Sequence, residues 1–114
     1  MSLIDKNQLD SISGGEPGLL LPILEDFVST ASELIAEIVN LDPSGQAEIA
    51  AARLHQLKGS SGTLGLSKFY EACSIAEDSC RSGMIPDLTG LQQLMSDSTA
   101  EAHAFLSSSG ARPD

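Results

Sequence analysis

The residues of this chain whose types and spacing could do chemistry lie between His55 and Gly62, in the segment H-Q-L-K-G-S-S-G. A neutral imidazole is a good nucleophile near neutral pH. If His55 took up a phosphoryl group, it would gain close to two negative charges, part of which Lys58 could balance. Gly59 and Gly62 would leave room for the phosphoryl oxygens and for the loops of a partner. The pattern therefore favours nucleophilic phosphoryl chemistry over a bare surface histidine.

The segment belongs to a predicted helix over residues 46–64, in which each glycine costs roughly 1 kcal/mol relative to alanine. At about 100° per residue, Leu54, Leu57 and Ser61 form an apolar stripe. The opposite face carries the histidine and its small or charged neighbours: Ala51, Ala52, His55, Lys58, Gly59 and Gly62. We therefore expect His55 to point away from the core, with Ala51, Ala52 and Gly62 in a surface onto which a partner docks.

These residues resemble the signature of histidine-containing phosphotransfer (HPt) domains of multistep phosphorelays. The family pattern is His, any residue, a hydrophobic residue, Lys, Gly and small residues, followed by a Gly that ends the helix. Residues 55–61, H-Q-L-K-G-S-S, and Gly65 match every position of that pattern. The likeness extends more weakly over nearly the whole chain, through the number and length of the predicted helices.

The resemblance also implies a residue that orients the histidine ring. In several HPt domains a carboxylate or amide on the next helix does this, and Glu77, 22 residues after His55, occupies the similar position. Glu77 would accept the Nδ1 proton and leave Nε2 free to attack. The alternative is that Glu77 is only a surface residue on a polar face, and Asp78 and Ser74 are less favoured substitutes.

The elements that must position these residues follow from the hydrophobic spacing. Helical periodicity predicts a short helix over 5–13 and longer helices over 17–41, 46–64, 67–82 and 88–107, with 108–114 as a frayed tail. Gly65 suits the C-terminal cap of the helix that bears His55. We therefore predict one domain over residues 1–114, an all-α antiparallel up-down-up-down four-helix bundle with a short N-terminal helix.

Composition sets the class of protein and of partner. The 114 residues are 41% apolar but only 4% aromatic, which predicts an aliphatic core of packed helices, and the net charge of −10 disfavours nucleic acid and anionic lipid as partners. Cys73 and Cys80 are too far apart on one helix to bridge, so we expect reduced core residues. We expect no signal peptide, no membrane span and a cytoplasmic location, either free-standing or at the end of a membrane-anchored sensor kinase.

Other candidate sites lack the residues that they would need. His103 has no Lys-Gly partner and is interpreted as a surface residue, and neither histidine has further ligands at metal-binding spacing. Residues 59–65 lack the ending of a phosphate-binding P-loop, and Ser60 and Ser61 do not follow a strand as a hydrolase nucleophile does. We therefore expect no metal, no cofactor and no ATP site, and so a phosphocarrier and not an enzyme.

The resulting hypothesis is a phosphorelay intermediate. His55 would accept a phosphoryl group from the aspartate of a receiver domain and pass it to the aspartate of another. Receiver domains, with or without a hybrid histidine kinase, would be the partners of a monomer. The alternative is a helical docking module without chemistry, which the intact set of His55, Lys58 and Gly59 disfavours.

Overall fold

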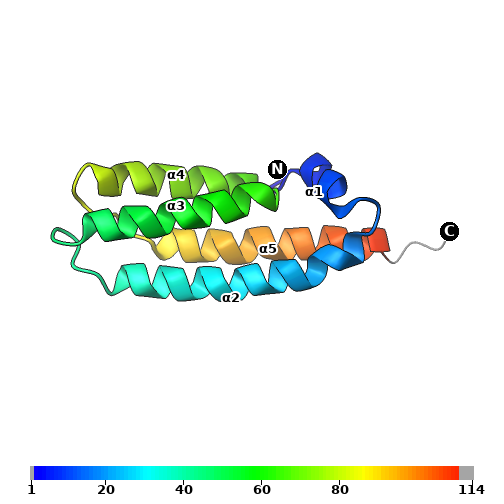
Figure 1. The fold of residues 1–114 in the computed structure, drawn as a ribbon, viewed down its shortest axis with the longest axis horizontal. Helices are drawn as coiled ribbons and strands as arrows, with labels where there is room; N and C mark the ends of the chain where they lie inside the picture. Colours follow the sequence, from blue (N-terminus) through cyan, green and yellow to red (C-terminus); the bar gives the residue numbers. More distant parts are fainter. Residues whose placement is uncertain (1, 111–114) are drawn as a thin grey trace.

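The computed structural model describes residues 2–110, which form helices and no strand. The elements in chain order are α1 (Lys6–Ser13), the 3-10 turn η1 (Pro17–Leu19), α2 (Leu20–Val39), α3 (Ala47–Thr63), α4 (Ser67–Arg81) and α5 (Thr89–Gly110). Helices α2 to α5 run antiparallel in a four-helix bundle, and α1 lies at the end of the bundle where α3 turns into α4 (Figure 1). Within residues 2–110, no helix combines the length and the apolar character that a membrane crossing requires.

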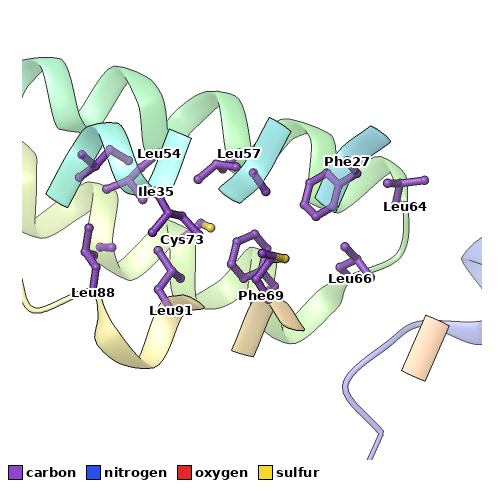
Figure 2. Packing of buried hydrophobic residues seen from close by; sticks show 14 of the residues in the cluster. Phe27, Ile35, Leu54, Leu57, Leu64, Leu66, Phe69, Cys73, Leu88 and Leu91 are labelled. Atoms are coloured by element: carbon purple, nitrogen blue, oxygen red, sulfur yellow. The ribbon is translucent and has the colours of Figure 1, made fainter. Parts of the chain in front are cut away.

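The core is a continuous apolar cluster between the four long helices, as the composition predicts (Figure 2). Leu54 and Leu57 of α3 are almost fully buried and belong to the cluster with Ile35 of α2. The two rings that the core contains, Phe27 and Phe69, meet edge to face with their centroids 6.1 Å apart. Leu54 and Leu57 therefore anchor one side of α3, which leaves the other side of that helix outside the core.

The closest helix pair of the bundle is α3 with α4, which lie side by side in Figure 1. Many of the residues that these two helices bury are small: Ala47, Ala50, Ala51 and Ser61 on α3, and Cys73, Ala76 and Cys80 on α4. Small side chains at a helix contact let the two backbones approach closely. Side chains on the outer edges of α3 and α4 can therefore reach one another.

The N-terminal segment is bonded to the turn between α3 and α4. Gly65 ends α3 in the left-handed conformation, with φ of 69°, and the amides of Gly65 and Leu66 donate to the carbonyls of Gly62 and Ser61 as a Schellman motif requires. The Gly65 carbonyl in turn accepts a 2.7 Å hydrogen bond from the amide of Asp5. A Cβ at Gly65 would lie 2.9 Å from the Asp5 carbonyl oxygen, so the turn has no space for another residue type.

Some helix boundaries differ from those predicted, for local reasons. The helix expected over 17–41 begins as the 3-10 turn at Pro17 and ends at Val39, because Asn40 and Leu41 tighten into i→i−3 hydrogen bonds before Pro43. The last helix, expected to end at residue 107, continues to Gly110, because a run of serines weakens a helix without breaking it. The tail predicted over 108–114 is therefore wrong for 108–110, and its residues 111–114 lie outside the described residues.

Candidate functional site

His55 projects from the middle of α3 on the side away from Leu54 and Leu57, and its side chain is 66% exposed. Lys58, one turn further along the helix, is more enclosed, with a side chain that is 22% exposed. The ring is held at one atom: Nδ1 of His55 lies 3.2 Å from Oε2 of Glu77 on α4. An imidazole that donates from Nδ1 has the lone pair on Nε2, so this contact selects the nitrogen that can react.

Glu77 is the residue at which the site converges. Its side chain is only 6% exposed, and three groups face its carboxylate. His55 Nδ1 and the guanidinium of Arg81 both face Oε2, with Arg81 Nε at 2.9 Å and its terminal nitrogen at 2.6 Å. Lys58 Nζ lies 3.0 Å from the other oxygen, Oε1. One nearly buried carboxylate therefore connects two cations to the exposed ring.

The two cations keep Glu77 ionised. Burial alone would raise the pKa of the carboxyl, but the hydrogen bonds and charges of Lys58 and Arg81 outweigh burial and lower the pKa from 4.5 to about 2. The ion pair with Glu77 also raises the pKa of Lys58, against the opposing effect of burial. At neutral pH Glu77 is therefore a carboxylate that accepts hydrogen bonds and does not take up the proton of His55.

The two glycines beside His55 have different surroundings. A Cβ at Gly59 would meet no atom within 4 Å, whereas a Cβ at Gly62 would lie 3.1 Å from Cδ2 of Tyr70. The bare backbone of Gly62 is therefore used inside the chain, where the half-exposed ring of Tyr70 lies against it. Nothing in the described chain uses the space at Gly59, so that space remains open to a group from outside.

The prediction that Ala51 contributes to a docking surface is wrong. Ala51 is fully buried, whereas Ala52 beside it is exposed. The error has a physical cause: on a helical wheel Ala51 falls on the polar face, but α4 packs so closely against α3 that the buried part of α3 is wider than its leucine stripe. Ala52 and Gly59 are the small exposed residues that remain near His55.

Sequence reasoning missed Arg81 and Tyr70 as neighbours of the site. The signal for Arg81 is its spacing of four residues from Glu77, which places a cation and a carboxylate together on one helix face. Tyr70 has no comparable signal, because its contact with Gly62 depends on how closely α3 and α4 pack.

His103 is exposed on α5, and its Nδ1 lies 3.4 Å from the hydroxyl of Ser107, so it takes no part in the site around His55 and Glu77.

Basic charge is concentrated on the two helices that build the site. Of the six Lys and Arg residues, four lie there: Arg53 and Lys58 on α3, and Lys68 and Arg81 on α4. Over their described lengths, α2 and α5 carry acidic residues and neither Lys nor Arg. Although the protein is strongly acidic, α3 and α4 around His55 carry less net negative charge than α2 and α5, and this favours the negative charge that a phosphoryl group would add there.

An apolar groove runs between α2 and α3, next to the turn of α3 that follows His55. Its walls include Ile23, Phe27 and Leu34 from α2 and Gln56 and Ser60 from α3. Ile23 is half exposed.

Among residues 2–110, no group of three or more His, Cys, Asp or Glu side chains is placed to hold a metal ion.

The fold and the site define a class of protein, a four-helix bundle with one exposed histidine held by a carboxylate from the neighbouring helix. The family model described as Hpt domain matches residues 22–109, from the first turn of α2 to the last turn of α5. The chain therefore belongs to the HPt domain family, whose members carry phosphoryl groups in two-component signalling. Comparison with curated proteins and with solved structures finds no match.

Proposed function

We propose that this protein is a phosphorelay intermediate in which His55 accepts a phosphoryl group from the aspartate of one receiver domain and passes it to the aspartate of another. The observation that carries the proposal is the contact of 3.2 Å between His55 Nδ1 and Glu77 Oε2, in a chain of the HPt family. His103, the other histidine, has no carboxylate contact of this kind among the described residues.

The proposed step needs no external base. The lone pair on Nε2 of His55 attacks the phosphorus of the receiver's aspartyl phosphate, the N–P bond forms, and the P–O bond breaks with its electrons remaining on the aspartate carboxylate. The Nδ1 proton stays on the ring, which becomes cationic. Glu77 stabilises that cation as a carboxylate, because its pKa of about 2 prevents it from taking the proton at neutral pH. Transfer to the second receiver reverses these bond changes.

Lys58 and Gly59 support the same step in different ways. The ammonium of Lys58 lies one helical turn from His55 and can turn toward the phosphoryl oxygens as their charge appears beside the ring. Gly59 leaves space on the exposed side of α3 for those oxygens and for the loop of the receiver that surrounds its aspartate. In this proposal the phosphoryl group comes from a partner that is already phosphorylated.

The docking surface of the proposal lies on the exposed face of α3 and at the groove beside it. Ala52 and Gly59 are exposed near His55, and the groove between α2 and α3 offers the half-exposed side chain of Ile23. At Gly62, which we also expected in this surface, the half-exposed ring of Tyr70 lies over the backbone, so the ring is the group that would meet a receiver there. We propose that the protein docks receivers as a monomeric single domain in the cytoplasm, whether it is free-standing or part of a sensor kinase.

The relay is tested with two receiver domains and radiolabelled phosphate. A receiver phosphorylated with labelled acetyl phosphate is freed of the small donor and mixed with this protein, and an unlabelled second receiver is then added. The expected result is label on this protein first and on the second receiver afterwards, with neither transfer in the His55→Gln variant. Tight binding of unphosphorylated receivers without any label, for every receiver tried, would favour a docking module without chemistry and contradict the proposal.

A further inference from the structure

Arg81 is the charged residue of the site to which the proposed function gives no task. It is the last residue of α4, and its side chain is 57% exposed. Two of its nitrogens lie 2.9 and 2.6 Å from Oε2 of Glu77, the same oxygen that faces His55 Nδ1. Lys58 faces the other oxygen at 3.0 Å. The carboxylate therefore has one cation at each oxygen, although only Lys58 is close along α3 to the nucleophile.

The burial of Glu77 makes the second cation matter. Removing the partner of a nearly buried carboxylate leaves an uncompensated charge, which is strongly unfavourable. If Lys58 were the only other cation at Glu77, its movement toward a phosphoryl group would leave the carboxylate with the largely exposed ring of His55 as its one partner, and the loss would oppose that movement. Arg81 donates to Oε2 through two nitrogens, so its positive charge continues to balance the negative charge of Glu77 whichever group Lys58 contacts.

We propose that Arg81 is a positioning residue for phosphotransfer, which holds the Glu77 carboxylate in place and compensated while Lys58 leaves it for the phosphoryl group on His55. This inference rests on the proposed function. It assigns the two cations different tasks: Lys58 exchanges between two anions, and Arg81 remains with one. Because Arg81 lies on the surface, its replacement leaves the buried core of the bundle unchanged.

The test follows Lys58 directly by NMR of the lysine side chains. The sequence contains three lysines, Lys6, Lys58 and Lys68, so the ammonium signals are few enough to assign by substitution. The signals are recorded before and after His55 is phosphorylated with phosphoramidate, and the rate of transfer from a phosphorylated receiver is measured on the same samples. The variants are Arg81→Gln, Arg81→Lys and, as a matched control, Arg53→Gln, whose guanidinium pairs with Glu37 on α2.

In the wild-type chain the Lys58 signal should shift on phosphorylation, and the signals of Lys6 and Lys68 should not. In Arg81→Gln the Lys58 shift should shrink and transfer should slow by roughly tenfold, the factor expected for one charge-assisted hydrogen bond. Arg81→Lys should restore most of both quantities, because it returns a cation to Glu77. Arg53→Gln should leave the Lys58 shift at its wild-type size, because Arg53 pairs with Glu37 and not with Glu77.

Two outcomes overturn this inference alone: a Lys58 shift in Arg81→Gln that equals the wild-type shift, or a wild-type Lys58 signal that does not respond to phosphorylation. If transfer slows in Arg81→Gln while the Lys58 shift is unchanged, the first outcome applies, and Arg81 affects transfer without freeing Lys58 from Glu77. A wild-type chain that takes no phosphoryl group on His55 overturns the proposed function and this inference together.

Discussion

Oε2 of Glu77 lies 3.2 Å from Nδ1 of His55, although the two residues are 22 positions apart and belong to different helices. The contact exists because small buried side chains, Ala51 on α3 and Ala76 on α4 among them, let the two helices approach closely. It fixes one ring nitrogen as a hydrogen-bond donor and so selects the other as the nucleophile. The close packing of two helix faces that carry small side chains thereby determines which atom of His55 reacts.

Replacing Glu77 with glutamine should slow phosphotransfer without unfolding the bundle. An amide oxygen can still accept a hydrogen bond from Nδ1, but it carries no charge to stabilise the ring cation or to hold Lys58 and Arg81. We expect the transfer rate from a phosphorylated receiver to fall by roughly tenfold, as for the loss of one charge-assisted hydrogen bond. The measurement is single-turnover transfer of labelled phosphate to His55.

Glu71→Gln is the matched control for this variant. Glu71 lies six residues before Glu77 on the same helix and pairs with a lysine, Lys68, at 3.6 Å, but its side chain is 63% exposed. Its replacement should leave the transfer rate unchanged. Equal rates for wild type and Glu77→Gln, or equal losses in both variants, would show that Glu77 has no specific effect on the histidine.

The stability of the fold should depend on the ionisation of Glu77 in acid. The pKa of this carboxyl is lowered in the folded chain from 4.5 to about 2, so the unfolded chain binds more protons between these values. The stabilisation is therefore complete above pH 4.5 and is lost as the pH falls toward 2. Urea unfolding at pH 6 and at pH 3 measures it, as the difference in unfolding free energy between wild type and Glu77→Gln.

We expect that difference to be about 1.5–3 kcal/mol at pH 6, the range for hydrogen bonds to a charged group, and to shrink at pH 3. Comparing the two chains at each pH cancels the contributions of the other carboxyls. A difference that is the same at both pH values would mean that the effect of the glutamine comes from packing and not from the charge of Glu77.

The two glycines beside His55 should respond in opposite ways to alanine. Gly59→Ala places a methyl group in open space, so the fold should gain about 0.5–1 kcal/mol from helix propensity while transfer slows through the lost clearance. Gly62→Ala places its methyl group 3.1 Å from the Tyr70 ring, so that gain should be cancelled or reversed. Thermal unfolding and transfer rates of both variants provide the measurements.

Tyr70→Ala provides the control, since it removes the ring that Gly62 accommodates. In that background Gly62→Ala should regain the stabilisation that Gly59→Ala shows in the wild type. If Gly62→Ala is stabilising with Tyr70 present, the contact with the ring does not account for the glycine. If Gly59→Ala transfers phosphate at the wild-type rate, the space at Gly59 is not needed for docking.

Much of this arrangement could be predicted from sequence because it depends on spacing within single helices. His55 and Leu57 fall on opposite sides of α3 by helical periodicity alone, and Gly65 ends that helix as its left-handed conformation requires. The all-helical bundle follows from the same spacing over the whole chain. Such features are local, so no knowledge of neighbouring helices is needed.

The rest depends on how closely two helices pack, which the spacing within one helix does not contain. Ala51 is buried because α4 covers it, and Gly62 is bare because Tyr70 from α4 lies against it. Arg81 is the exception, because its pairing with Glu77 follows from their spacing of four residues on one helix. The prediction of a helix ending at residue 107 failed for a different reason, since Ser107 and Ser108 do not break a helix.

The central claim is that His55 is the residue that carries the phosphoryl group, and the most direct measurement is the position of the label. The protein is phosphorylated by a labelled receiver, digested under alkaline conditions that preserve phosphohistidine, and mapped by mass spectrometry beside the His55→Gln and His103→Gln variants. The account predicts one phosphohistidine at His55, lost in His55→Gln and retained in His103→Gln. Label on His103, or label that persists in His55→Gln, would contradict it.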